Sequence, residues 1–207
     1  NIILKNLPNT ELCIWDDVFQ HRFVKPGLMI LTTTFKYPFY KDEILPIGNL
    51  RESKDSAKRA DIIVVTKCPI DLSKKDKESF LKSLKPEEKQ KVFFSYLSYS
   101  EIIKSDKDKV DINTLRDNEF ILVTGIADSS YLVNFLKNKG YKFKHLRYPD
   151  HYNFNKLSVD KISSLSVNKN ILTTEKDFGR LKPKINDRKV FYIEVSLEFP
   201  DEINEVN

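Results

Sequence analysis

Short runs of apolar, β-branched or aromatic residues recur along the chain, and polar segments separate them. A run of this kind, with few polar interruptions, is typical of a strand that is buried on both faces of a parallel sheet. The runs cover residues 12–15, 28–33, 61–66, 91–96, 120–124, 170–173 and 190–195. We predict a strand at each of them.

Amphipathic segments between several of these runs predict helices. Residues 73–84 begin with a capping Ser that an acid follows three residues later, and their apolar residues share one face. Residues 130–139 show a similar apolar face and stop at Gly140, a residue favoured just beyond a helix end. Residues 175–181 predict a short helix directly after a strand. Alternating strands and helices form βαβ units, so we predict an α/β fold with a mostly parallel sheet and flanking helices.

Polar composition divides the chain into two predicted lobes. Residues 101–118 are rich in Asp and Lys and poor in apolar side chains, which is typical of a linker. We predict a first α/β lobe over residues 1–100, a linker over 101–118 and a second, smaller α/β lobe over 119–207. A chain of 207 residues is long enough to bury a sizeable core.

The formal net charge of +5 permits anionic partners such as phosphates or an anionic membrane surface. Bases and acids are interspersed, which is typical of solvated helix faces, and no nucleic-acid motif occurs, so we expect no nucleic-acid partner. No apolar run approaches the ~18 residues of a membrane span, so we expect a soluble chain. Cys13 and Cys68 each lie in or just after an apolar run, which favours buried, reduced thiols of a cytosolic protein over a disulfide.

The most informative polar cluster follows the first apolar run, where Asp16 and Asp17 precede Gln20, His21 and Arg22. Ligands of parallel sheets bind outside the carboxyl ends of the strands, which places both carboxylates where chemistry is usually done. Adjacent carboxylates repel each other, so such a pair indicates a cation, usually Mg²⁺, or a proton-transfer role. A polar turn after a strand would explain the acids alone, but His21 and Arg22 favour a functional site.

A second cluster lies at residues 48–52. Gly48 lets the backbone approach a ligand, Arg51 can contact a phosphate with two parallel hydrogen bonds, and Glu52 can hold a cation or orient Arg51. A turn followed by a surface ion pair explains the same residues.

Three further clusters follow later strands or lie between them. Asp150 beside His151 is a carboxylate next to an imidazole, a pair that can tune a base or orient a hydroxyl. Residues 173–177 fit a functional role and a helix N-cap with first-turn acids equally well. Residues 124–128 contain a single Gly, and a tight strand-to-helix turn explains them better than a phosphate loop.

Taken together, these clusters resemble the tetraacyldisaccharide 4'-kinase family, the lipid A 4'-kinases of Gram-negative bacteria. The blocks that match in order are residues 16–22, 48–52, 59–61, 149–151 and 174–177, with a weaker match at 124–127. The DDVFQHR block at 16–22 is specific. The blocks span nearly the whole chain, and the resemblance is to the later part of the family only.

The resemblance implies a P-loop-kinase-like fold of two α/β lobes and a lipid kinase of lipid A biosynthesis. The implied reaction moves the γ-phosphoryl group of ATP to the 4'-hydroxyl of a tetraacyldisaccharide 1-phosphate. The implied cofactor is Mg²⁺, with ATP as co-substrate and the lipid A disaccharide precursor as the second substrate. The implied location is the cytoplasmic face of the inner membrane, with the membrane surface as a peripheral partner.

The resemblance also assigns roles near the metal. Asp16 and Asp17 match catalytic carboxylates that serve Mg²⁺ and its water shell. Arg51 and Glu52 match residues near the phosphates and the metal. How Asp16, Asp17 and Glu52 divide the metal role stays open.

The remaining matches lie beside the nucleotide and in the second lobe. Gln20 and His21 match residues beside the nucleotide cleft. Asp150 and His151 match a catalytic pair from the second lobe that supports the base.

The chain departs from the family at its phosphate-binding loop. The five glycines form no Gly-rich loop ending in Lys-Ser/Thr, and Val18 stands where the family often has Gly. We therefore expect a truncated kinase that is inactive alone. The alternative is a non-catalytic α/β binding module that has lost its nucleotide site.

Residues 34–41 place four aromatic rings and two lysines just past a predicted strand. Rings with flanking Lys suit a membrane–water interface or an acyl-chain edge, and this loop would then help to seat the lipid substrate. Rings that pack back onto the domain are the slightly favoured alternative.

Overall fold

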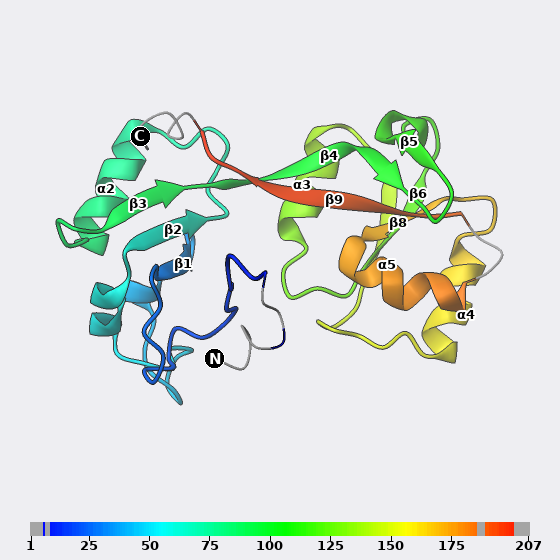
Figure 1. Cartoon of the computed structure of the whole chain (residues 1–207). Helices are drawn as coiled ribbons and strands as arrows, with labels where there is room; N and C mark the ends of the chain where they lie inside the picture. The colour runs from blue at the N-terminus through cyan, green and yellow to red at the C-terminus, as the bar shows by residue number, and fades with distance from the viewer. Residues whose placement is uncertain (1–5, 7–8, 186–188, 201–207) are drawn as a thin grey trace. The chain divides into compact units, whose positions relative to one another are not determined.

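The structure is a computed structural model that describes residues 6, 9–185 and 189–200. The chain forms two compact units, residues 1–96 with 199–207 and residues 97–198. Figure 1 shows the elements of both units, and each unit is described by itself below.

The first unit is built on a three-stranded parallel sheet in the order β1-β2-β3. Its strands are β1 (Ile30–Thr34), β2 (Ile62–Thr66) and β3 (Lys91–Phe94). Helix α2 (Lys74–Leu84) connects β2 to β3, and the 3-10 helices η1 (Phe39–Lys41) and η2 (Lys54–Arg59) lie between β1 and β2. As predicted, Ser73 caps α2, and Phe80 and Leu84 of this helix pack on the sheet core.

The predicted strand at residues 12–15 is wrong. These residues form no strand, and the side chains of Leu12 and Ile14 are 75% and 83% exposed. A short apolar run becomes a strand only where a neighbouring strand pairs with its backbone, and among the described residues none pairs with this run. Cys13 is therefore exposed rather than buried, whereas Cys68 is buried as predicted, and both are free cysteines.

The second unit is built on a six-stranded mixed sheet in the order β5-β4-β9-β8-β6-β7. Its strands are β4 (Tyr96–Lys104), β5 (Lys109–Asp111), β6 (Phe120–Thr124), β7 (Phe143–Arg147), β8 (Ile171–Thr174) and β9 (Val190–Glu198). Strands β7, β6, β8 and β9 pair in parallel, while β4 and β5 are antiparallel. The helices are α3 (Ser130–Asn138), α4 (Lys156–Leu165) and α5 (Glu175–Leu181), with 3-10 helices η3 (Ile112–Leu115) and η4 (Lys182–Lys184).

Both faces of strand β6 are buried, although only β7 separates it from one edge of the sheet. Alternate side chains of a strand point to opposite faces. Leu122 packs in one core cluster with Leu132 of α3, and Ile121 packs in a second cluster with Ile162 of α4. Helices α3 and α4 therefore cover opposite faces of β6.

The predicted linker at residues 101–118 is also wrong. These residues hold the last four residues of β4 and all of β5 and η3, and they belong to the second unit. Ile103, Ile112 and Leu115 are almost completely buried between the charged residues. An antiparallel hairpin can expose one face to water, so its composition is as polar as that of a linker.

The buried side chain of Leu122 provides a test of the core of the second unit. Leu122→Ala should lower the free energy of unfolding by about 2–5 kcal/mol, because it opens a cavity in a filled core. The matched control is Leu157→Ala on α4, where the side chain is 80% exposed and the expected loss is below about 0.5 kcal/mol. Urea unfolding followed by circular dichroism measures both losses. Equal losses would contradict this assignment of the core.

Candidate functional site

Two of the predicted site residues of the first unit form an ion pair. The Nη1 atom of Arg51 donates to Oδ1 and Oδ2 of Asp17 at 3.0 and 2.9 Å. Both side chains are more than half exposed, so the pair contributes little to stability. Asp17 has a left-handed backbone at φ 53°, a conformation that Asp tolerates better than most residues. The pair therefore orients two charged groups at the surface more than it stabilises the fold.

Glu52 connects two more of the matching blocks. Its carboxylate accepts a hydrogen bond from Nε of Arg22 at 3.4 Å and forms a short ion pair with Nη2 of Arg59. Arg59 also donates to the backbone oxygen of Phe19 at 3.0 Å and lies over the Phe19 ring. Blocks 16–22, 48–52 and 59–61 thus meet in one cluster of the first unit.

Burial alone would raise the pKa of Glu52. The hydrogen bonds from Ser56 and Arg22 and the charges of Arg59 and Arg22 outweigh burial and hold this pKa below its ordinary value of 4.5. Glu52 is therefore a carboxylate that the surrounding arginines keep ionised.

Gly48 is required by its own loop, whereas the sequence led us to expect close approach to a ligand. A Cβ atom there would lie 2.3 Å from the backbone oxygen of Glu43 and 2.4 Å from Oδ1 of Asp42. The Asp42 carboxylate accepts from the backbone N–H of Glu43 at 2.8 Å and from the backbone and side chain of Asn49 at 3.2 and 3.0 Å. These bonds close the loop immediately before Arg51.

The remaining predicted residues of the first unit lie on a tight turn after Asp17. Nε2 of Gln20 donates to the backbone oxygen of Asp17 at 3.0 Å, and the N–H of His21 donates to Val18 at 2.8 Å. The side chains of Asp16 and His21 are exposed. No group of three or more His, Cys, Asp or Glu side chains suited to a metal ion occurs within the described part of the chain. The structure therefore does not join Asp16, Asp17 and Glu52 into such a group.

In the second unit the matching blocks meet at the carboxyl ends of three neighbouring parallel strands, β7, β6 and β8. Gly125 follows β6, residues 149–151 follow β7, and Thr174 ends β8. The chain passes from β6 to β7 on one side of β6 and then returns to β8 on the other side. The carboxyl ends beside such a reversal are where open α/β sheets bind ligands.

The Asp177 carboxylate holds this edge together from a fully buried position. Its Oδ2 atom accepts from the N–H of Gly125 and from the hydroxyl of Thr174, both at 2.8 Å. Its Oδ1 atom accepts from Nη2 of Arg180 at 2.5 Å. Thr174 also caps α5, as the capping interpretation predicted.

Asp150 and His151 lie next to this edge, and their side chains are exposed to solvent. The N–H of His151 donates to the backbone oxygen of Gly125 at 3.1 Å and to Oδ1 of Asp150 at 2.9 Å. Nε2 of His151 lies 3.9 Å from Oδ2 of Asp150, and the His151 side chain is 82% exposed. The backbone is therefore fixed, while imidazole and carboxylate stay accessible.

Sequence reasoning missed several cationic partners at both clusters. It did not pair Arg22 or Arg59 with Glu52, because those contacts depend on the tertiary fold. Arg180 was also missed, although its position three residues after Asp177 on a predicted helix is a detectable ion-pair spacing.

The aromatic segment at residues 34–41 mostly packs inward, as the favoured alternative expected. The ring of Phe35 stacks on Phe80 at 5.3 Å between centroids, and Tyr40 meets the same ring edge-on at 5.5 Å. Phe39 packs on this cluster too, while Tyr37 is 73% exposed. Phe35 and Phe39 are therefore partly buried against the core, which favours packing over contact with a lipid.

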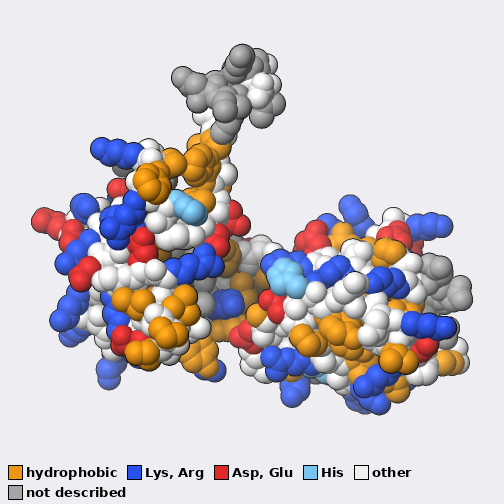
Figure 2. Space-filling model, turned by 90° about the horizontal axis from the view of Figure 1, so that it is seen from below, with side chains coloured by type: hydrophobic (Ala, Val, Ile, Leu, Met, Phe, Trp, Pro, Cys, Tyr) orange, Lys and Arg blue, Asp and Glu red, His pale blue; other side chains and the backbone are white. Residues whose placement is uncertain are grey.

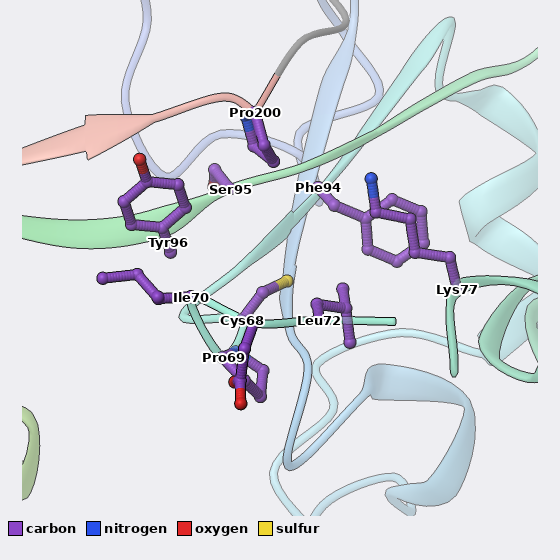
Figure 3. A pocket seen from close by; sticks show the side chains of 10 residues that line it. Cys68, Pro69, Ile70, Leu72, Lys77, Phe94, Ser95, Tyr96 and Pro200 are labelled. Carbon is purple, nitrogen blue, oxygen red and sulfur yellow. The ribbon is translucent and has the colours of Figure 1, made fainter. Parts of the chain in front are cut away.

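A cavity of about 410 Å³ lies beyond the carboxyl ends of β2 and β3 in the first unit (Figure 3). Its lining combines apolar side chains with the Cys68 thiol and Lys77. None of the site residues predicted from the sequence lines it.

The face in Figure 2 carries acidic and basic side chains interspersed rather than segregated, with hydrophobic side chains exposed among them. Among the described residues, no helix is both long and apolar enough to cross a bilayer.

Comparison with known proteins adds the family relationship. The family model for LpxK, tetraacyldisaccharide-1-P 4'-kinase, matches residues 1–206. The tetraacyldisaccharide 4'-kinase of Flavobacterium psychrophilum is 39% identical over 201 residues, which cover 95% of this chain and 57% of that protein. The tetraacyldisaccharide 4'-kinase of Bacteroides thetaiotaomicron is 35% identical over 189 residues, covering 84% of this chain and 50% of that protein.

A solved structure supports the same relationship. The crystal structure of an apo form of LpxK from Aquifex aeolicus in complex with ATP matches with a TM-score of 0.66 and 28% identity. The match covers 95% of this chain and 56% of that chain. The chain thus has an α/β fold similar to LpxK and spans about half the length of the relatives that it matches.

The Glu52 cluster generates a test in the first unit. Glu52→Gln should lower the free energy of unfolding by about 1–2 kcal/mol at pH 7, because it removes the charge that Arg59 and Arg22 surround. The matched control is Glu43→Gln, whose exposed pair with Lys54 should contribute less than about 0.5 kcal/mol. Urea unfolding measures both.

The pH dependence of the Glu52→Gln effect follows from the lowered pKa of Glu52. The folded state binds fewer protons than the unfolded state, so the stabilisation is present above the ordinary pKa of 4.5 and is lost as pH falls through the folded value. The difference between wild type and Glu52→Gln should therefore narrow below pH 4.5. A difference that stays constant through this range would show that the charge of Glu52 is not responsible.

Proposed function

The chain belongs to the tetraacyldisaccharide-1-P 4'-kinase family, and we propose that it acts as part of a lipid kinase with a P-loop-kinase-like core. The proposed reaction transfers the γ-phosphoryl group of ATP to the 4'-hydroxyl of a tetraacyldisaccharide 1-phosphate in lipid A biosynthesis. The observation that carries the proposal is the assembly of the matching blocks into one cluster in each unit, where charged side chains remain accessible.

In the first unit the proposed roles concern phosphate and metal. Arg51 has a planar guanidinium suited to phosphate oxygens. Its ion pair with Asp17 is exposed, so breaking the pair when a ligand binds would cost little free energy. Gln20 and His21 are proposed to lie on the nucleotide side. Glu52 holds Arg22 and Arg59 in place for the same charged surface.

Mg²⁺ fits part of this donor set. Mg²⁺ usually takes one or two carboxylates together with waters and substrate phosphates, so exposed Asp16 and Asp17 have suitable chemistry. Bound there, it would neutralise charge on the transferring phosphoryl group. Glu52, which the sequence also predicted as a ligand, could join only after leaving its arginine partners.

In the second unit, Asp150 and His151 are proposed to support the base that takes the proton of the 4'-hydroxyl. The carboxylate can hold the imidazole in one orientation, while the ring stays exposed to solvent. The lipid substrate and the basic chain together support action at the cytoplasmic face of the inner membrane, with the membrane surface as a peripheral partner.

One observation favours a second candidate, a binding module without catalysis. The 207 residues contain no Gly-rich loop ending in Lys-Ser/Thr, and such a loop supplies the amides and the Lys that hold the phosphates of ATP. The chain spans only about half the length of these relatives, so we favour a kinase whose phosphate loop lies in the part that the chain does not match.

The two candidates are separated by joining the missing part to this chain. The 207-residue chain alone should show no turnover and bind MgATP more weakly than about 1 mM, because no phosphate loop positions the nucleotide. A hybrid that adds the part of the Flavobacterium psychrophilum kinase outside the match should phosphorylate tetraacyldisaccharide 1-phosphate. Calorimetry and radiolabelled ATP measure these two properties. A folded hybrid with no transfer would favour the binding module.

Asp17 provides a test of the proposed phosphate and metal roles in the hybrid. Asp17→Ala should lower kcat about 100-fold or more, because it removes charge at the reacting phosphates. The same change should cost less than about 1 kcal/mol of stability, since the pair with Arg51 is exposed. Asp55→Ala, at an exposed acid of η2, is the matched control and should leave kcat unchanged. Near-normal turnover of Asp17→Ala would remove Asp17 from the site.

A further inference from the structure

The ion pair between buried Asp177 and partly buried Arg180 contacts the loop that follows β6. A buried carboxylate is costly unless charge and hydrogen bonds compensate it, and Asp177 is fully buried with three donors around it. Only one of the three, the hydroxyl of Thr174, belongs to the helix cap. The carboxylate instead reaches Gly125, on a different strand end, so capping α5 does not explain its position.

Both backbone polar groups of Gly125 form hydrogen bonds with the ion pair. Its N–H donates to Asp177 at 2.8 Å, and its oxygen accepts from Nη2 of Arg180 at 3.2 Å. A Cβ atom on Gly125 would lie 2.9 Å from Oδ1 of Asp177 and 3.3 Å from the oxygen of Pro149. Only glycine lets these groups approach so closely.

The same Gly125 oxygen also accepts the N–H of His151 at 3.1 Å. His151 has a left-handed backbone at φ 54°, a conformation that costs free energy and persists where the surroundings impose it. The loops after β6 and β7 are thus joined through one peptide oxygen, and the exposed imidazole projects from the residue that this oxygen holds.

We propose that Asp177 and Arg180 are positioning residues that fix the Gly125 peptide and, through it, the backbone of His151. Neither side chain needs to touch substrate for this role. The effect of this link on catalysis rests on the proposed function, whereas the link between the two loops does not.

Amide hydrogen exchange in the 207-residue chain tests the link itself. In Asp177→Asn and in Arg180→Met, the amides of Gly125 and His151 should exchange about tenfold faster or more, because their shared anchor is weakened. The amide of Ile121, which donates to Asn170 at 3.0 Å, should stay protected and show that the sheet is intact. Asp160→Asn, an exposed acid of α4, is the matched control and should change none of these rates.

Arg180→Lys keeps the positive charge and should recover part of the lost protection. Unchanged protection of His151 in Arg180→Met would overturn the inference, even if Asp177→Asn failed to fold.

Kinetics of the hybrid kinase test the catalytic consequence. Arg180→Met should lower kcat about tenfold or more while KM for ATP stays within about twofold, because a displaced His151 affects the reacting hydroxyl and not nucleotide binding. Arg180→Lys should again recover part of the loss. An active hybrid with unchanged kcat in Arg180→Met would overturn the positioning role. A wild-type hybrid without activity would overturn the proposed function, and the exchange rates would then decide the link alone.

Discussion

Parallel strand pairing is the constraint on which the site depends. Strands that run in parallel end at one edge of the sheet, so polar residues that follow different strands are brought together without being close in sequence. In the second unit this pairing gathers the loops after β6, β7 and β8, which are separated by whole helices along the chain. Strand β6 makes the arrangement rigid, because cores on both faces enclose it.

The two clusters differ in how their carboxylates are compensated. In the first unit, Asp17 and Arg51 are exposed, and water already screens their charges. Such a pair can exchange partners at little cost, which suits a surface that receives charged phosphates. In the second unit, Asp177 is shielded from water, and losing a partner there would leave an uncompensated charge. That contrast supports a rigid base beneath Asp150 and His151 and an adaptable charged surface around Arg51.

Local pattern predicted the elements whose stability is mostly local or fully buried. The bounds of β6 and α5 follow directly from an apolar run and from a capping Thr with first-turn acids. The run at residues 12–15 has the same composition as a strand, but no strand pairs with it in the part of the chain that the structure describes. Such partners cannot be deduced from one segment. The sequence did not predict the hairpin within residues 101–118, because an edge strand that exposes one face is as polar as a linker.

The candidate site was predictable to a similar degree. Residue types and blocks predicted Asp17, Arg51, Asp150 and His151 as site residues. The structure pairs Asp17 with Arg51, a contact that the sequence did not predict, and it keeps the side chains of adjacent Asp150 and His151 near each other. The ion pair of Glu52 with Arg22 and the hydrogen bond between Asp177 and Gly125 join segments that are distant in sequence. Local spacing along the chain therefore could not predict them.

In the proposed function, this chain supplies part of the site of a kinase that acts on a tetraacyldisaccharide. The most direct measurement is phosphorus–proton correlation NMR of the lipid product made by the hybrid kinase. We expect a new phosphate ester on the 4' oxygen of the disaccharide. A product phosphorylated at any other hydroxyl, or unmodified lipid in the presence of folded hybrid and MgATP, would contradict it.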